Sequence, residues 1–330
     1  MKNSLLNLFL APAVYGWALF ASATDLPGPI VTTEWLAANL QNVQIVDVRS
    51  NTNSFIAPPE FETDTKTGKK SLQTVGGHIP GAKLIDTKNV RTERQIGELK
   101  VKYMIPEKAA WEKFVRAAGI NADKPIVLVP VGQETADVDD ALRVYWQFKV
   151  YGENNVAVLD GGMAQWLIES RSFDQSPAQT NTAGSWLAKD DLSNQYLASS
   201  DDVAQATADK STTIIDARDL KSYLGLSKRD YVFAFGHIPG AKLFPGELMT
   251  KTASGAVKFY SAKTYHALMA AQGIDNSKQV ISYCNSGHLA SGPWFVASQV
   301  LGNKSARLYD GSMHEWTLEK RPVEGAVPLN

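Results

Sequence analysis

The sequence has very little cysteine, since its 330 residues contain only Cys284. A single cysteine cannot form a disulfide within the chain, so packing, hydrogen bonds and ion pairs must hold the fold. An exposed free thiol is a liability in an oxidising compartment, and an exported protein that keeps one usually has a use for it. Because the amino-terminal segment indicates export, the composition favours a reactive role for Cys284.

The chain also lacks an excess of charge of either sign. It has 33 Lys and Arg against 34 Asp and Glu, which gives a formal net charge of -1. No basic patch accompanies the aromatic residues, so we expect no binding to nucleic acid or to an acidic membrane surface. With 44% apolar and 20% charged residues, the composition excludes a disordered chain and suffices for two ordinary hydrophobic cores.

A metal-binding pattern is missing as well. Two of the five histidines belong to a repeated turn, and the others show no ligand spacing with one another or with the cysteine. Asp47 and Asp216 could be acid–base carboxylates, but each stands two positions before an arginine at a strand end. We interpret the pairs with Arg49 and Arg218 as braces for loops, because carboxylate and guanidinium groups form directional hydrogen bonds.

No apolar run is long enough for a convincing membrane anchor. Residues 1–23 contain a short basic start, an apolar stretch interrupted by Asn7, Pro12 and Gly16, and the small residues 21–23. This order is typical of a cleaved signal peptide and argues against a spanning helix. We expect cleavage after Ala23, a periplasmic or secreted protein, and no membrane association afterwards.

An internal repeat organises the rest of the chain. Each half contains D-x-R at a strand end, the sequence G-H-I-P-G-A, an apolar strand, and D-G-[GS]-M-x-x-W. These motifs occupy residues 47–49, 77–82, 126–130 and 160–166, and then residues 216–218, 236–241, 280–284 and 310–316. The pattern predicts two domains of one fold, 24–170 and 195–330, joined by a polar linker over 171–194.

Each repeat is expected to be an α/β domain. Short β-branched strands, such as 126–130, 156–159 and 213–218, alternate with helical segments near 106–118, 139–150 and 261–272. This alternation predicts a parallel sheet with helices on both faces. Ligands of such sheets bind at the carboxyl ends of the strands, and Cys284 stands at one of these ends.

The segment around Cys284 is predicted to be a strand, a tight loop and a helix start. Backbone N–H groups in the loop and the positive end of the helix dipole would favour a thiolate, so we expect an ionised and reachable thiol. The alternative is a buried cysteine that only fills the core. In the first repeat Pro130 aligns with Cys284 and no nucleophile follows it, so that repeat is expected to be catalytically silent and to wall the pocket.

Together these motifs resemble the tandem-domain rhodaneses, sulfurtransferases of the thiosulfate and 3-mercaptopyruvate type. The resemblance spans nearly all of the chain after residue 23, and it rests on the duplicated motifs, the Cys loop and the silent first half. It implies two rhodanese-like domains and no metal or organic cofactor. It is specific because the order and duplication of the motifs match, although each motif alone is weak.

The resemblance implies transfer of a sulfane sulfur through a persulfide on Cys284. Thiosulfate or 3-mercaptopyruvate would be the small-molecule donor, and cyanide, a thiol or a sulfur-accepting redox protein would be the acceptor. The loop amides would stabilise the persulfide anion, and Gly287 would allow the tight turn. The loop comprises Cys284, Asn285, Ser286, Gly287, His288 and Leu289. The alternative is a non-catalytic persulfide carrier that delivers sulfur to a partner protein.

The identity of the donor-binding groups stays open at this stage. Thiosulfate-preferring members have Arg or Lys after the cysteine, where this chain has Asn285 and Ser286, and the family's arginine after D-x-R aligns with Ser222. His288 could donate to a donor anion or point to solvent. The cations available in the second repeat are Arg218, Lys221, Lys228 and Arg229.

One further enzyme class with this architecture is disfavoured. Phosphatases related to the rhodanese fold use a C-x5-R motif, in which the arginine binds phosphate with two hydrogen bonds. The corresponding position here is Ala290. The sequence therefore argues against a phosphatase.

Overall fold

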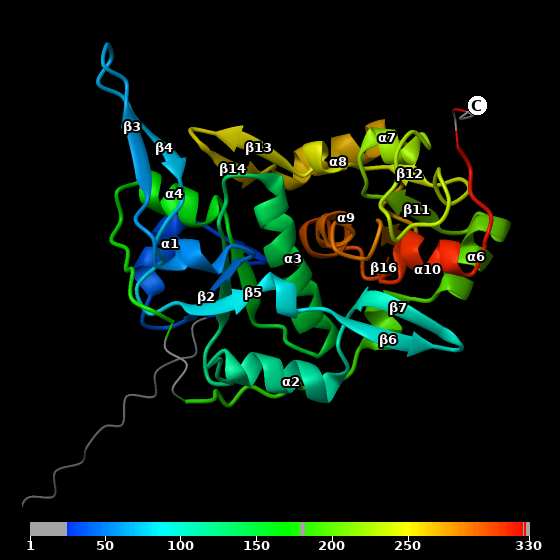
Figure 1. Cartoon of the computed structure of the whole chain (residues 1–330), viewed down its shortest axis with the longest axis horizontal. Helices are drawn as coiled ribbons and strands as arrows, with labels where there is room; N and C mark the ends of the chain where they lie inside the picture. The colour runs from blue at the N-terminus through cyan, green and yellow to red at the C-terminus, as the bar shows by residue number, and fades with distance from the viewer. Residues whose placement is uncertain (1–24, 179–181, 326, 328–330) are drawn as a thin grey trace, which may run out of the picture.

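The computed structural model describes residues 25–178, 182–325 and 327. The predicted signal peptide, residues 1–23, lies outside these residues. No helix among the described residues is long and apolar enough to cross a membrane. The chain forms two halves that lie side by side (Figure 1), and each half contains one parallel five-stranded sheet.

The first repeat is built around a sheet with the strand order β1-β9-β8-β2-β5, and every neighbouring pair is parallel. Its central strand β8 has the sequence IVLVP and is buried throughout, as expected for a β-branched strand covered on both faces. The strands are β1 (Ile30–Val31), β2 (Gln44–Arg49), β5 (Lys83–Asp86), β8 (Ile126–Pro130) and β9 (Val156–Leu159).

Helices cover both faces of this sheet. One face packs against α1 and α4, and the other packs against α2 and α3. Thr32 caps α1 by accepting a hydrogen bond from the Trp35 amide. The bounds are α1 (Thr33–Asn39), α2 (Lys108–Ala117), α3 (Thr135–Val150) and α4 (Gly162–Ile168), with 3-10 turns η1 (Thr52–Phe55) and η2 (Thr87–Asn89).

The second repeat reproduces this architecture with the order β10-β16-β15-β11-β12. Its sheet is covered by α8 and α9 on one face and by α6 and α10 on the other. The strands are β10 (Leu197–Ala198), β11 (Thr213–Asp216), β12 (Lys242–Leu243), β15 (Val280–Tyr283) and β16 (Ala306–Tyr309). The helices are α5 (Ser193–Tyr196), α6 (Ser200–Asp209), α7 (Leu220–Tyr223), α8 (Ala262–Ala271), α9 (Ser291–Phe295), which continues as a π-helix over Val296–Val300, and α10 (Ser312–Leu318), with a 3-10 turn η3 (Gly246–Leu248).

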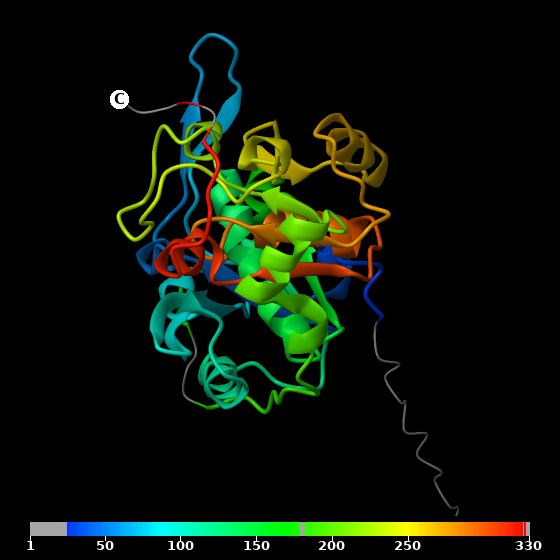
Figure 2. The same cartoon turned by 90° about the vertical axis from the view of Figure 1, so that its right-hand side faces the viewer.

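Among the described residues, three antiparallel hairpins extend from the repeats, and no sequence pattern predicted them. The hairpin of β3 (Glu60–Thr63) and β4 (Lys70–Thr74) projects from the body of the molecule in two perpendicular views (Figure 1 and Figure 2). The other two are β6 (Thr92–Ile96) with β7 (Leu99–Met104), and β13 (Thr250–Ala253) with β14 (Ala256–Phe259). Each of these two hairpins makes hydrogen bonds with the opposite repeat.

The two repeats share one hydrophobic core. Helices α3 and α9 pack against each other in the middle of the molecule (Figure 1). Buried side chains from both helices, including Trp146 and Trp294, belong to one continuous cluster that reaches both sheets. The two halves are therefore joined through a common apolar interior and not through the connecting segment alone.

The segment expected as a linker follows the surface of the first repeat. Gly184 donates to Arg116 O at 2.7 Å, and Trp186, which is 1% exposed, donates through its indole to Glu153. An added Cβ at Gly184 would lie 1.9 Å from Ile120 O, so this close approach requires glycine. The connection is held against the domain at these points.

Candidate active site

Cys284 follows the last residue of β15, at the carboxyl end of the central strand of the second sheet. β15 lies between β11 and β16, so the loop after it is flanked by the loops that follow both neighbours. Loops at this edge of a parallel sheet face a common space. The strand therefore delivers the thiol to the edge where the sequence predicted it.

Ser312 holds the two ends of the tight turn together. Its hydroxyl oxygen accepts hydrogen bonds from the amides of Cys284 at 3.0 Å and Gly287 at 2.9 Å, and it donates to Tyr309 O at 2.8 Å. Ser312 is fully buried and has a φ of 51°, an unfavourable value for a residue other than glycine. The serine of D-G-S-M thus anchors the backbone on either side of Asn285 and Ser286.

Gly287 turns the loop back on itself with a φ of 72°. A Cβ at this position would lie 2.3 Å from Asp310 Oδ1 and 2.6 Å from Asp310 O. Its carbonyl oxygen accepts a hydrogen bond from Arg143 Nη1 at 2.9 Å, and the same guanidinium pairs with Asp310. Glycine is required here both for the backbone conformation and for the close approach.

Several amides of the loop remain free to bind an anion. Among the described residues, no protein acceptor receives a hydrogen bond from the amides of Asn285, Ser286, His288 or Leu289. Consecutive N–H groups around a residue with positive φ form a concavity that suits an anion. The loop can therefore stabilise a thiolate or a persulfide without help from a metal.

The thiol is less accessible than the sequence led us to expect. Cys284 is only 1% exposed and joins the hydrophobic cluster between the repeats. The expectation of a freely reachable thiol is corrected, because helix α3 and the residues before β6 belong to the first repeat and cover the loop. Charged groups nevertheless face it. Burial lowers the pKa of Arg91, and negative charge on Cys284 opposes that shift. The pKa of Arg218 is raised despite its burial, because Asp216 pairs with it and accepts its hydrogen bonds.

His288 faces the first repeat. Its Nε2 lies 2.9 Å from Asp140 Oδ1 on α3, and the side chain is 18% exposed. Burial lowers the pKa of His288, although the hydrogen bond with Asp140 opposes this shift. With a neutral ring, Nε2–H donates to Asp140, so the histidine links the Cys loop to α3 rather than pointing to solvent.

The four cations expected in the second repeat occupy different environments. Arg218 is 1% exposed, pairs with Asp216 and donates to Gly236 O at 2.8 Å, so it braces the G-H-I-P-G-A turn. The side chains of Lys221 and Arg229 are exposed, and Lys228 lies over the ring of Phe235 at 5.4 Å. Among the described residues, these three cations make no hydrogen bond or ion pair with the Cys loop.

Residues of the first repeat that sequence reasoning did not single out complete the site. Arg91 Nη1 donates to Ser286 Oγ at 3.3 Å, and Arg143 and Asp140 contact the loop as described above. None belongs to a repeated motif, so no pattern marked them. Only Arg143 has a sequence signal, since it is a charged residue within the largely apolar second half of α3. Arg91 and Asp140 stand among other polar and charged residues.

The corresponding loop of the first repeat carries no thiol. β8 ends at Pro130 in the strand position that β15 holds in the second sheet. A Cβ at Gly132, in this loop, would lie 2.4 Å from Gly161 O, so the backbones approach closely here. Gly132 O accepts a hydrogen bond from the Val257 amide at 2.9 Å, which binds the loop to hairpin β13–β14.

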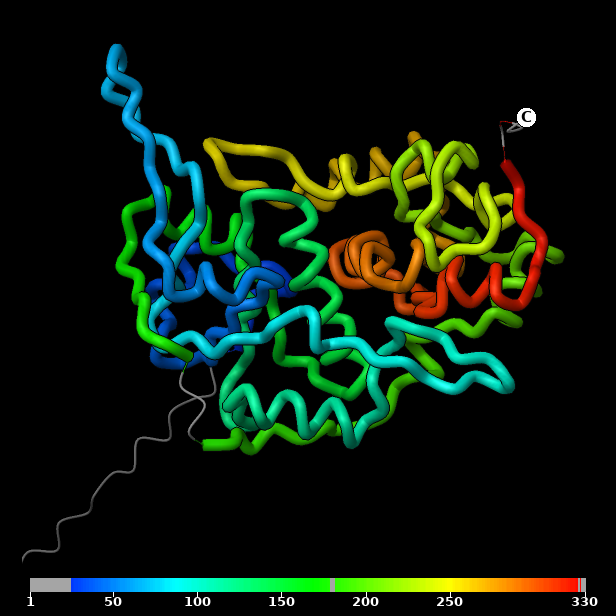
Figure 3. The backbone as a smooth tube through the Cα atoms, in the orientation of Figure 1, coloured from blue at the N-terminus to red at the C-terminus, as the bar shows by residue number. Residues whose placement is uncertain are grey.

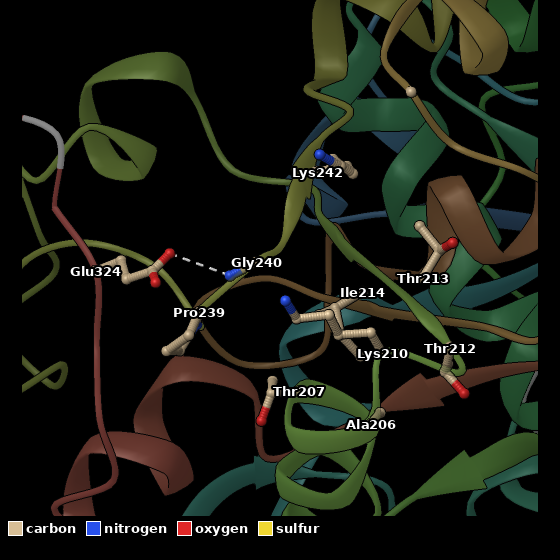
Figure 4. A pocket seen from close by; sticks show the side chains of 11 residues that line it. Ala206, Thr207, Lys210, Thr212, Thr213, Ile214, Pro239, Gly240, Lys242 and Glu324 are labelled. Carbon is tan, nitrogen blue, oxygen red and sulfur yellow. Dashed lines mark hydrogen bonds between the residues drawn. The ribbon is translucent and has the colours of Figure 1, made fainter.

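A cavity of about 460 Å³ lies elsewhere in the second repeat (Figure 4). Thr213, the first residue of β11, lines it, and Glu324 accepts a hydrogen bond there from the Gly240 amide at 3.1 Å. The cavity is at the amino ends of the parallel strands, whereas Cys284 is at their carboxyl ends. The first repeat has a related hollow around Pro80, Gly81 and Lys83, so this depression belongs to the fold.

The described residues contain no group of three or more His, Cys, Asp or Glu side chains placed to hold a metal ion. The chemistry available at the loop is that of a thiol, backbone amides and guanidinium groups. These groups suit nucleophilic attack on an electrophilic sulfur and the binding of small anions.

Comparison with known proteins finds the same domain family in both repeats. A model of the rhodanese-like domain matches residues 32–169 and 199–319. The thiosulfate sulfurtransferase of Bos taurus is 27% identical over 299 residues, which cover 87% of this chain and 91% of the bovine protein.

Solved structures with the same architecture include two that match most of this chain. The 3-mercaptopyruvate sulfotransferase SseA from Escherichia coli aligns with a TM-score of 0.66 and 23% identity over 86% of this chain and 98% of its own. Tum1 protein from Saccharomyces cerevisiae aligns with a TM-score of 0.71 and 18% identity over 91% and 99%. At these identities the likeness concerns the fold of both repeats.

Proposed function

Because this chain belongs to the family of rhodanese-like domains, we propose that it is a sulfurtransferase that carries sulfane sulfur on Cys284. The predicted fold, two repeated α/β domains of the rhodanese type, is confirmed. The observation that carries the proposal is the position of the only cysteine. It lies at the carboxyl end of the central strand, in a loop in which the amides of Asn285, Ser286, His288 and Leu289 donate to no acceptor among the described residues.

The first half-reaction forms a persulfide. The Cys284 thiolate attacks the outer sulfur of thiosulfate, a new sulfur–sulfur bond forms, and sulfite leaves with the electron pair of the bond that breaks. The amides of Asn285, Ser286, His288 and Leu289 stabilise the negative charge on the terminal sulfur of the persulfide. The thiolate is converted to a persulfide anion, so the charge on the enzyme is unchanged.

The second half-reaction returns the thiolate. Cyanide, or the thiolate of a small thiol, attacks the terminal sulfur of the persulfide, and Cys284 leaves as a thiolate. With cyanide the product is thiocyanate, and charge and atoms balance. Thiosulfate is the favoured donor and 3-mercaptopyruvate is the second candidate, since the similar proteins carry both names.

The second candidate function is a persulfide carrier that hands sulfur to a partner protein. The burial of Cys284, at 1% exposure, favours the enzyme, because a small donor enters a narrow site more readily than the side chain of a folded partner. The first repeat is proposed to be catalytically silent, since Pro130 ends the strand that corresponds to β15.

Turnover with defined donors separates the two candidates. The purified protein is incubated with thiosulfate or 3-mercaptopyruvate and excess cyanide, and thiocyanate is measured over time. The enzyme produces many equivalents of thiocyanate per chain, whereas a carrier that these small donors do not reload releases at most the one equivalent of sulfur that it already holds. Absence of thiocyanate with both donors would contradict the sulfurtransferase proposal.

The cellular location is proposed from the sequence alone. Residues 1–23 form a signal peptide in this proposal, and the protein acts as a periplasmic or secreted enzyme without an attachment to the membrane. Amino-terminal sequencing of the protein purified from its producing cells should start at Thr24. A chain that starts at Met1 would contradict export by cleavage.

A further inference from the structure

Arg91 brings a positive charge from the first repeat to the loop that carries Cys284. It lies between η2 and β6, at the start of the cyan hairpin that runs from the first repeat towards the second (Figure 3). Its Nη1 donates to Ser286 Oγ at 3.3 Å, two positions after the cysteine. The contact joins residues that are 195 positions apart in the sequence.

The charge of Arg91 is not neutralised by a carboxylate. Arg143 pairs with Asp310 and Arg218 pairs with Asp216, so the two fully buried guanidinium groups near the loop are already matched. Among the described residues, Arg91 has no carboxylate at ion-pair distance. A half-buried guanidinium without a counter-charge attracts an anion that enters the loop.

The electrostatic surroundings of Arg91 agree with this interpretation. Burial lowers the pKa of Arg91, and the like charge of Arg143 lowers it further. Negative charge on Cys284 and on Asp310 acts in the opposite direction. A second negative group beside the thiol would therefore be stabilised by Arg91, and it would in turn stabilise the positive charge of Arg91.

Aromatic side chains hold the guanidinium in place. Its carbon atom lies 5.1 Å from the centre of the Tyr103 ring, and Tyr103 lies 5.0 Å from the ring of Tyr231 in the second repeat. Stacking fixes the plane of the guanidinium while leaving N–H groups along its edge to bind a ligand. Tyr103 also has a φ of 66°, a strained value that often accompanies functional sites.

The silent loop of the first repeat provides an internal comparison. Thr250 begins β13, the hairpin strand of the second repeat that corresponds to β6, and its hydroxyl lies 2.6 Å from that of Thr135. Thr135 begins α3, directly after the loop that lacks a thiol. Both loops are therefore reached by the hairpin of the other repeat, but only the loop with the thiol receives a cation from it among the described residues.

We propose that Arg91 binds the anionic group of the sulfur donor while Cys284 attacks the sulfur to be transferred. That group is the sulfonate of thiosulfate or the carboxylate of 3-mercaptopyruvate, and the assignment rests on the proposed function. It also explains why Ser222 can replace an arginine in the second repeat. Ser222 is buried and its hydroxyl donates to Asp219 at 2.8 Å, so the cation comes from the first repeat instead.

Binding of the donor without transfer tests this assignment. Thiosulfate and 3-mercaptopyruvate are each titrated by calorimetry into Cys284→Ser protein and into the same protein with Arg91→Ala, Arg91→Lys or Arg94→Ala. Arg94 is the matched control, because it is an arginine of the same hairpin that lies near Glu107, at 3.8 Å. Thermal unfolding of each variant verifies that it is folded. If Arg91→Ala is not folded, Arg91→Lys takes its place in the comparison with the parent.

Arg91→Ala should raise the Kd of the donor about 10- to 100-fold, since a hydrogen-bonded charge pair is lost. The Kd of the Arg91→Lys variant should lie between the values for the Cys284→Ser parent and for Arg91→Ala. The Kd of the Arg94→Ala variant should stay within about twofold of the parent value. Equal Kd values for the parent and both Arg91 variants, or no binding by the parent, would overturn the assignment. Turnover by the wild type is measured separately, so failure of the enzyme proposal and failure of this assignment are distinguishable.

Discussion

At the scale of single residues, the site depends on a thiol that is buried and yet surrounded by polar groups. Cys284 is 1% exposed, Ser312 fixes the amides on two sides of the turn, and Arg91 approaches from the other repeat. An apolar pocket would disfavour the thiolate, whereas free amides and a cation favour it. The balance of these groups, and not exposure, makes the cysteine suitable as a nucleophile.

Gly287→Ala should disrupt the Cys loop. The added Cβ would lie 2.3 Å from Asp310 Oδ1, and the φ of 72° is unfavourable for alanine. We expect a loss of more than about 2 kcal/mol in the free energy of unfolding and a fall in kcat of at least about tenfold. Urea denaturation and thiocyanate production measure the two effects.

Gly240→Ala is the matched control for that substitution. Gly240 has a φ of 75°, but no atom lies within 4 Å of the position that an alanine Cβ would occupy. The free energy of unfolding of this variant should fall by only about 1 kcal/mol, and its activity should be unchanged. If both variants lose the same stability and the same activity, the close packing around Gly287 does not matter for the site.

Glu315 should make the stability of the protein depend on pH. It lies on α10 and is 4% exposed, and burial raises its pKa to about 7 from the usual 4.5. Between these values the folded state keeps a proton that the unfolded state has released, so the free energy of unfolding falls as the pH rises from about 4.5 to 7. Once the pH is above 7, the free energy of unfolding has fallen by at most about 3 kcal/mol in total.

Glu315→Gln should therefore stabilise the protein at pH 8 and have little effect at pH 4.5. Urea denaturation at both values measures the difference, and Glu98→Gln, an exposed position in the β6–β7 turn, is the control. A stabilisation by Glu315→Gln that is equal at the two pH values would contradict the link between its burial and its protonation.

At the scale of elements, two hairpins connect the repeats in a symmetrical way. The Ile105 amide, just after β7, donates to Asp310 Oδ2 at 2.6 Å, and the Phe259 amide, at the end of β14, donates to Asp160 Oδ1 at 2.9 Å. Each aspartate belongs to a D-G-[GS]-M motif. In each repeat the aspartate of this motif thus accepts a hydrogen bond from the hairpin region of the opposite repeat.

Asp310→Asn and Asp160→Asn should lower the free energy of unfolding by different amounts. Asp310 also pairs with Arg143, which is fully buried, so loss of the carboxylate leaves a buried charge without its partner. We expect about 3–5 kcal/mol for Asp310→Asn and about 1 kcal/mol for Asp160→Asn, which has no arginine partner among the described residues. Urea denaturation measures both, and equal losses would show that the ion pair adds nothing.

These elements also show which parts of the fold the sequence could predict. The strands 126–130 and 156–159 were predicted from short β-branched runs, and the structure confirms them. The strand predicted over 213–218 is also present, but it ends at Asp216. The hairpins were not predicted. Hairpins β6–β7 and β13–β14 are joined to the other repeat by hydrogen bonds that no local pattern indicates. The strands of hairpin β3–β4 are mostly polar, and Leu72 is their only buried residue. Helix α6 was also missed, although Ser199 and Asp202 form a capping box at its start.

The candidate site was predictable only in its local part. The Cys loop follows from one segment, since strand, nucleophile and glycine are consecutive. Arg91, Asp140 and Arg143 reach the loop from distant positions, and only the packing of the two repeats brings them there. From the sequence, the expected donor-binding cations were residues close to the motifs, such as Lys228 and Arg229.

At the scale of the whole molecule, the two repeats form one structural unit. The largest hydrophobic cluster includes residues of both sheets, and α3 packs directly against α9. The first repeat has no thiol at the corresponding loop but contributes charged groups to the loop of the second. Its role thus extends beyond packing to the completion of the site.

The shared core predicts a single cooperative unfolding transition. Separating the repeats would expose the apolar surfaces of α3 and α9, so neither half should remain folded when the other unfolds. Differential scanning calorimetry should give one peak with a van't Hoff enthalpy close to the calorimetric enthalpy. Two resolved transitions would contradict a common core.

The central claim is that sulfur resides on Cys284 during transfer. The wild-type protein and the Cys284→Ser variant are incubated with thiosulfate, freed of excess donor, and measured by intact mass spectrometry before and after addition of cyanide. The account predicts a gain of one sulfur atom by the wild type, its release by cyanide as thiocyanate, and no gain by the variant. A wild type that gains no sulfur, or a variant that gains as much, would contradict the account.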